Sequence, residues 1–219
     1  MAGTLALAPL SAPTGVAAST GTLAGASAED CADGSAAVLV LVAGGLPEGS
    51  TDLRGARERV RDAIGELAPD AAAAGVTLAI EPLHPMYAAD RCAVSTLDQA
   101  LEIAERFPAE QVGVVVDTYH VWWDDRAPAA VARAGAAGRL HSFQLADWTT
   151  PLPAGVLNGR GQLGDGVIDL RAWCELAAAA GHTGPVEVEL FNDELWGRDG
   201  VEVLEETLKR FTELGISES

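Results

Sequence analysis

Polar side chains end several apolar runs of this sequence, at positions where packing gives no reason for them. The four residues are Glu81 in TLAIEP, Asp117 in GVVVD, Gln144 in HSFQLAD and Glu189 in VEVELF. Consecutive parallel strands bring their carboxyl ends to the same rim, so we expect these side chains to converge. Three carboxylates and an amide oxygen would repel one another without a cation between them. Oxygen ligands of this kind suit Mg²⁺ or Mn²⁺ better than zinc, so the four residues predict a metal site.

Further polar residues follow these positions and predict a pocket for a polyol. His84, His120 and Asp147 each come three residues after one of the predicted ligands, on loops just past the rim. Apolar walls for this pocket are expected from three tryptophans: Trp122, Trp123 and Trp148. Each of these side chains also has a structural interpretation, since a buried histidine or tryptophan often serves packing alone.

A glycine-rich loop, NGRGQLGDG, presents Arg160 as the one cation of this region. A guanidinium beside carboxylates suits a hydroxyl-rich or anionic substrate group. The loop is not a phosphate-binding loop, because GxxxxGK[ST] is absent. His141 precedes Gln144 by three residues on the same strand, so we expect it on the opposite side of the pleat, away from the site.

The elements that must position these residues alternate between strand and helix from residue 36 onward. Apolar runs predict strands at 37–43, 76–81, 112–117, 140–146 and 186–191, and amphipathic segments between them predict helices. This order is typical of a parallel sheet, either an open doubly wound sheet or a (β/α)8 barrel. No GxGxxG follows a strand, which favours the barrel. A full barrel takes roughly 250 residues, whereas residues 36–219 suffice for about six units. Either a sixth strand lies between 44 and 75, or five units carry long loops.

Composition narrows the class of partner. The net charge of −18 argues against a nucleic-acid partner, and no run of 18 apolar residues predicts a membrane span. Residues 1–35 are rich in Ala, Gly, Ser, Thr and Pro without a lasting period, so we expect a loosely ordered segment ahead of one domain at 36–219. Cys31, Cys92 and Cys174 form no CxxC pair, and no Lys or Arg precedes Arg54 as a secretory signal would require. Both observations predict a cytoplasmic protein with reduced thiols.

Five ordered motifs resemble one family. AIEPLHPMYAADR, VVVDTYHVWW, FQLADW, RGQLGDGVIDL and VEVELF together are similar to the xylose isomerase-like superfamily of TIM-barrel sugar isomerases and epimerases, over residues 36–210. The superfamily includes hydroxypyruvate isomerase, inosose dehydratase and the endonuclease IV branch. The resemblance implies a divalent metal, Mn²⁺ or Mg²⁺ before Zn²⁺ or Co²⁺, held by the four residues named first. Most members carry His where this chain has Gln144, but hydroxypyruvate isomerase-like members carry Gln.

The resemblance also implies a reaction. Glu81 and Glu189 would move a proton next to the carbonyl of a sugar or small keto-hydroxy substrate through an enediolate. His84, His120, Asp147, Trp148 and Arg160 would contact that substrate. The alternatives are an inosose dehydratase-like lyase and an inactive partial-barrel fragment. A DNA-repair nuclease would need several zinc-binding histidines and a basic face, which a chain with four histidines does not offer.

The resemblance breaks at the N-terminus. The run AAVLVLVAGG would be about the third strand of the family's barrel, and residues 1–35 are too short to supply the first two units. We therefore expect an incomplete TIM-type (β/α) barrel of about six units, with its first two strands missing or replaced. Exposed strand edges are a liability unless covered, so a homodimer is a further expectation.

Overall fold

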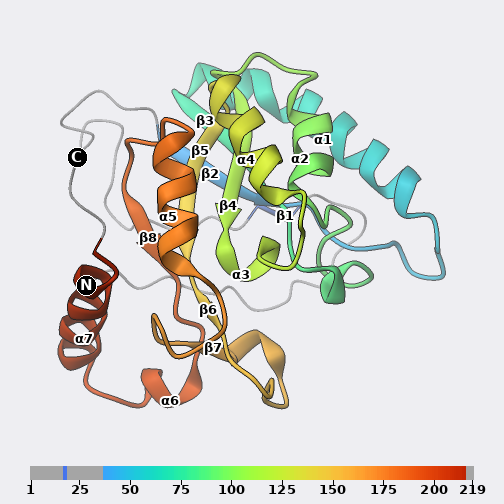
Figure 1. Ribbon diagram of the computed structural model, residues 1–219. Helices are drawn as coiled ribbons and strands as arrows, with labels where there is room; N and C mark the ends of the chain where they lie inside the picture. Colours follow the sequence, from blue (N-terminus) through green and yellow to red (C-terminus); the bar gives the residue numbers. More distant parts are fainter. Residues whose placement is uncertain (1–16, 19–36, 216–219) are drawn as a thin grey trace.

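Valine- and leucine-rich runs form the parallel strands of one sheet (Figure 1). The computed structural model describes residues 17–18 and 37–215. Its strand order is β1-β2-β3-β4-β5-β8, and the neighbours from β2 to β8 are parallel. These strands are β2 (Ala37–Val42), β3 (Val76–Glu81), β4 (Val112–Asp117), β5 (Leu140–Leu145) and β8 (Val186–Val188). All five predicted strands are confirmed, although the last is three residues long.

The strand count corrects one expectation. Residues 44–75 contribute helix α1 and no strand of the sheet, so five units with long loops describe the structure better than six. The described residues contain no strand–helix unit ahead of β2. That edge instead pairs with β1 (Ala17–Ala18), which runs antiparallel to β2. The rest of the predicted segment 1–35, with Cys31, lies outside the described residues.

Helices follow the strands and cover the sheet. They are α1 (Leu53–Ala73), α2 (Leu97–Ala104), α4 (Ala127–Ala136), α5 (Leu170–Ala179) and α7 (Gly200–Glu213), with short helices α3 (Thr118–Val121) and α6 (Asp193–Trp196). Local signals set their ends. At the start of α2 the side chain of Thr96 accepts from the Gln99 N–H, and Gly75 follows the end of α1 with φ of 70°.

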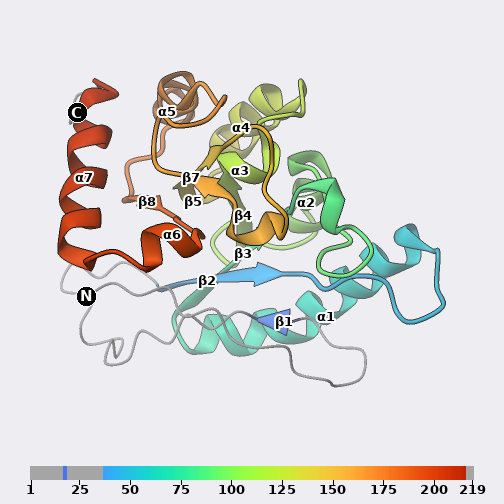
Figure 2. The same ribbon diagram turned by 90° about the horizontal axis from the view of Figure 1, so that it is seen from below.

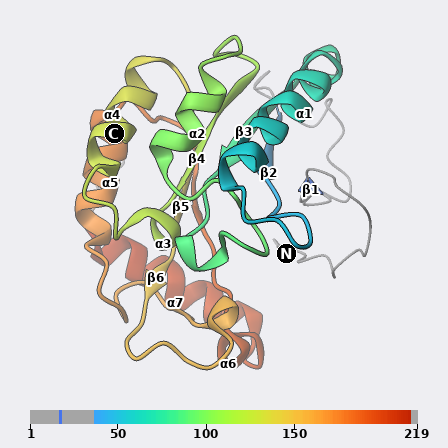
Figure 3. The same cartoon turned by 90° about the vertical axis from the view of Figure 1, so that its right-hand side faces the viewer.

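The sheet is curved and open, a partial barrel. Helices α1 and α7 lie on opposite sides of the molecule in all three views (Figures 1, 2 and 3). The core lies between strands and helices, and all six residues of β4 are buried. Strands covered on both faces read as continuous apolar runs, which is why they were visible in the sequence. Among the described residues, no helix is both long and apolar enough to cross a bilayer.

The loop after β5 contains structure that the sequence did not predict. β6 (Asp147–Trp148) and β7 (Arg160–Gly161) form an antiparallel ribbon in which Trp148 pairs with Arg160. The 3₁₀ helix η2 (Val156–Asn158) lies between these two strands, whereas the 3₁₀ helix η1 (Pro85–Tyr87) follows β3. The ribbon folds the glycine-rich loop back over the carboxyl ends of the strands, and so delivers Arg160 to the rim.

Candidate active site

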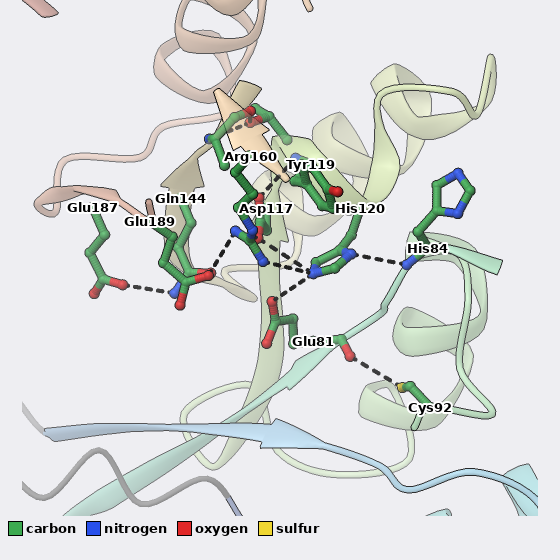
Figure 4. Close-up of polar contacts among 12 residues, drawn as sticks. Glu81, His84, Cys92, Asp117, Tyr119, His120, Gln144, Arg160, Glu187 and Glu189 are labelled. Carbon is green, nitrogen blue, oxygen red and sulfur yellow. Dashed lines mark hydrogen bonds and ion pairs between the residues drawn. The ribbon is translucent and has the colours of Figure 1, made fainter. Parts of the chain in front are cut away.

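The four predicted ligands meet at the carboxyl ends of the strands (Figure 4). Glu81 and Asp117 are the last residues of β3 and β4, and Gln144 is the register partner of Asp117 on β5. Glu189 lies one residue past β8, where its backbone N–H donates to the Leu145 carbonyl at 3.0 Å. The parallel order of the strands is therefore what brings together residues far apart in the sequence.

Two carboxylates and one imidazole form the tightest group of this rim. Ligand atoms of Glu81, Asp117 and His120 all lie within 4.8 Å of one another, and all three residues are buried. Nε2 of His120 lies 3.8 Å from Oε1 of Glu81 and 3.7 Å from Oδ2 of Asp117. These separations are too long for hydrogen bonds, but ligand atoms at such spacing can bind one metal ion together.

Arg160 crosses this group from the β6–β7 ribbon. Its Nη1 donates to Oδ2 of Asp117 at 3.0 Å and to Oε2 of Glu189 at 2.8 Å. The guanidinium is stacked between two rings, 4.6 Å from the centroid of Tyr119 and 4.8 Å from that of Phe191. Burial disfavours its charge, but the surrounding carboxylates outweigh this, so the pKa of Arg160 is raised. The residue is a fixed cation at the centre of the rim.

Both ring nitrogens of His120 face groups that can only donate a hydrogen bond. Its Nδ1 lies 3.1 Å from the backbone nitrogen of His84, and its Nε2 lies 3.3 Å from Nη2 of Arg160. Burial lowers the pKa of His120 to about 3, so the ring is neutral. A neutral ring accepts at one nitrogen only, so His120 can satisfy one of these two donors. Its Nε2 also faces the carboxylates of Glu81 and Asp117, so His120 adds a nitrogen to the group that could hold a metal ion.

Two glutamates of this rim are poised to hold protons. The pKa of Glu81 is raised well above its usual value by burial, and then by the charges of Glu189 and Asp117. Burial also raises the pKa of Glu189 to about 7, although Arg160 opposes the shift. Carboxyl groups near neutrality suit general acid–base chemistry.

A comparison with known families identifies the architecture around this rim. A family model described as a xylose isomerase-like TIM barrel matches residues 24–214. The chain belongs to this family.

Individual relatives agree with the family match. Inosose isomerase of Bacillus subtilis (strain 168) is 30% identical over 154 residues, which are 69% of this chain and 52% of the relative. A crystal structure of a protein from Sinorhizobium meliloti 1021 is 47% identical, with a TM-score of 0.77 over 81% of this chain and 64% of that one. The IolI protein, solved with a bound zinc atom, is 26% identical, with a TM-score of 0.65 over 81% and 61% of the two chains. The chain spans about half the length of the curated relatives it matches.

The donor set of this xylose isomerase-like rim fits a divalent cation. Three buried or nearly buried carboxylates face one another, and the cation that compensates them among the described residues is Arg160. Gln144 adds an orphaned polar atom, because its Oε1 is buried and has no hydrogen-bond partner in the part of the chain that the structure describes. A buried amide oxygen without a donor is costly, and a metal ion would satisfy it. Carboxylate and amide oxygens are also the chemistry that hard divalent cations select.

Asp147 is placed differently from the substrate contact that we predicted. It is fully buried, and its two carboxylate oxygens accept from four backbone N–H groups, those of Trp148, Gly164, Gly166 and Ile168, at 2.8 to 3.2 Å. Gly164 has φ of 87°, and a Cβ at Gly166 would collide with the carboxylate. Asp147 thus holds the glycine-rich loop closed, and the glycines serve this tight turn rather than flexibility.

The remaining predicted residues lie near the rim with separate roles. The ring of His84 packs 4.8 Å from that of Trp148, while its backbone N–H holds His120. Trp148 is 7% exposed and packs on Tyr119 and Trp122, whereas Trp123 is 39% exposed. His141 contacts the Ala109 carbonyl at 2.9 Å, away from the site as expected. Cys92 and Cys174 are free and buried.

Three residues of the site were missed in the sequence. Tyr119 and Phe191 stack on Arg160, and Glu187 accepts a hydrogen bond from Gln144. Tyr119 and Phe191 each lie two residues after a predicted ligand, one residue short of the spacing at which His84 and His120 follow theirs. Glu187 had a clearer signal, because it precedes Glu189 by two and so shares its face of the strand.

Proposed function

We propose that this protein is a divalent-metal-dependent isomerase or epimerase that moves a proton next to the carbonyl of a polyhydroxylated substrate. The observation that carries the proposal is the convergence of Glu81 and Glu189. Glu81 ends β3 and Glu189 follows β8, and both side chains lie in one group with Asp117 and Arg160. Two carboxyl groups on one rim can act as the base that removes a proton and the acid that returns it.

Metal binding is assigned to Glu81, Asp117, Gln144 and Glu189. A cation there would polarise the carbonyl and hydroxyl oxygens of the substrate and stabilise the negative charge of the enediolate. The all-oxygen donor set favours Mn²⁺ or Mg²⁺. Zinc in the IolI structure shows that another member of the fold takes a different ion.

Neighbouring residues orient the substrate in this proposal. The ring of His120, neutral because burial lowers its pKa to about 3, hydrogen-bonds to a substrate oxygen at the rim through Nε2. Arg160 is held in place by Tyr119 and Phe191, so its charge is preorganised beside the developing enediolate. The rings of Trp148 and His84 form an aromatic wall against which a sugar or cyclitol ring can pack.

The substrate class follows from the donors and from the relatives. Hydroxyl-rich ketones offer several oxygens to His120, Arg160 and the cation, and curated relatives are named for inosose, a cyclic polyhydroxy ketone. A lyase that removes water from such a ketone would begin with the same proton abstraction, so the second candidate shares this site.

Exchange of substrate hydrogen with solvent tests the proposal. The full chain with Mn²⁺ is incubated in D₂O with inosose and a panel of ketoses, and the products are followed by NMR and mass spectrometry. We expect a product that is an isomer of the substrate and carries deuterium at the carbon next to the carbonyl. Loss of water would assign the lyase instead. Absence of both deuterium uptake and product across the panel would contradict the proposal.

A further inference from the structure

Gln144 and Glu187 form a pair that ties the rim to the outer edge of the sheet. They are register partners on β5 and β8, and the amide nitrogen Nε2 of Gln144 donates to Oε2 of Glu187 at 2.8 Å (Figure 4). Gln144 is 4% exposed, whereas Glu187 lies on the exposed edge strand. The contact joins a buried amide to a carboxylate that water can reach.

This pairing determines which end of the amide faces the rim. An ionised carboxylate has acceptor atoms only, so the NH₂ group of Gln144 must face Glu187. The amide is planar, and its oxygen then points the other way. That oxygen is the buried Oε1 that lacks a partner among the described residues. If the amide turned over, NH₂ would face the cluster and oxygen would face a carboxylate.

We propose that Glu187 is a positioning residue that fixes the amide of Gln144 with its oxygen aimed into the rim, where it serves as a metal ligand. The metal-binding part of this inference rests on the proposed function. The charged carboxylate of Glu187 also polarises the Gln144 amide through its NH₂ group. This makes the amide oxygen a stronger electron-pair donor to a metal ion. Outer partners of this kind tune affinity even though they never touch the ion.

The orientation itself is tested on the metal-free protein by NMR. The chain has four glutamines, Gln99, Gln111, Gln144 and Gln162. Their side-chain NH₂ signals are assigned by comparison with a Gln144→Met variant. In the wild type we expect slow exchange of the Gln144 NH₂ protons with solvent, and in Glu187→Ala a clear shift and at least tenfold faster exchange. The buried Gln162, which donates to Thr207 at 2.8 Å, is the internal control and should not change. Unchanged Gln144 signals in Glu187→Ala would overturn the proposal.

The consequence for metal binding is measured by calorimetric titration with Mn²⁺. Glu187→Ala should bind Mn²⁺ about 10 to 100-fold more weakly than the wild type. Glu187→Gln should lie between them, because an amide can accept from Gln144 but can also donate to it in the reversed orientation. Glu66→Gln, an equal charge change on the exposed face of α1, should leave the affinity unchanged.

Two results would count against the role of Glu187 in metal binding. Equal Mn²⁺ affinity of the wild type and Glu187→Ala would overturn it directly. Equal weakening in Glu66→Gln would attribute the effect to net charge and overturn it as well. If the wild type itself bound no Mn²⁺, the proposed function would fail, and the NMR exchange of Gln144 would still decide whether Glu187 orients the amide.

Discussion

Asp147 and the carboxylates of the rim are all largely withdrawn from solvent, yet their surroundings are opposite. Asp147 accepts from four backbone N–H groups, which stabilise its carboxylate in place of water. Glu81 and Glu189 face other carboxylates and one shared arginine, and the pKa of each is raised. A carboxylate saturated by backbone donors stabilises a loop. Carboxylates that face one another without such backbone donors indicate a candidate ligand-binding site.

The buried arginines repeat this contrast. Arg139 donates to three main-chain carbonyls, those of Ala104, Val112 and Phe107, at 2.6 to 2.8 Å. Arg160 instead donates to side chains, and its Nε is buried without a partner among the described residues. Arg139 therefore joins α2 to the sheet, whereas Arg160 belongs to the chemistry of the rim.

The largest expected effect follows from removing the proton carrier at Glu189. Glu189→Gln should lower kcat by about 10³-fold, because general acid–base groups contribute roughly 10² to 10⁴-fold. The variant should remain folded, since an amide keeps the size of the side chain and can accept from Arg160. Turnover in the deuterium assay is the measurement. Near-normal turnover would remove Glu189 from the mechanism.

Asp147→Asn should destabilise the fold, because Asp147 holds the glycine-rich loop and takes no part in the proposed reaction. Asparagine replaces one accepting oxygen with an NH₂ group that confronts the N–H groups of Gly164 and Gly166. We expect a loss of about 3 kcal/mol in the free energy of unfolding, from the range for charge-assisted hydrogen bonds to buried groups. Urea denaturation measures it, with Asp125→Asn as a control on an exposed loop. Wild-type stability would place Asp147 with the substrate contacts after all.

The raised pKa values give a smaller effect on stability against pH. In the folded chain Glu81 and Glu189 hold protons that the unfolded chain, with ordinary carboxyl pKa values near 4.5, has released. Folding therefore weakens as the pH rises from about 4.5 to about 7, by roughly 2.5 kcal/mol from Glu189 alone in the metal-free protein. Glu189→Gln should show a shallower decline in urea denaturation across that window. Parallel curves for the two proteins would show that Glu189 does not titrate there.

Much of this arrangement could be predicted from the sequence, because buried parallel strands read as apolar runs that end in polar residues. Glu81, Asp117, Gln144 and Glu189 could be placed on one rim from strand order alone. The loop could not, since its shape depends on contacts between Asp147 and N–H groups up to 21 residues away. The stacking of Tyr119 and Phe191 on Arg160 was hidden for the same reason. It requires the β6–β7 ribbon, whose two-residue strands leave no periodic signal.

Thermal unfolding of the full chain with and without millimolar Mn²⁺ tests the claim that the rim holds a divalent cation. A ligand at 100 times its dissociation constant stabilises the native state by about 2.7 kcal/mol. For a chain of this size that corresponds to a rise in Tm of roughly 5 to 10 °C. We predict such a rise for the wild type and its loss in Asp117→Asn. An unchanged Tm of the wild type in Mn²⁺ would contradict the claim.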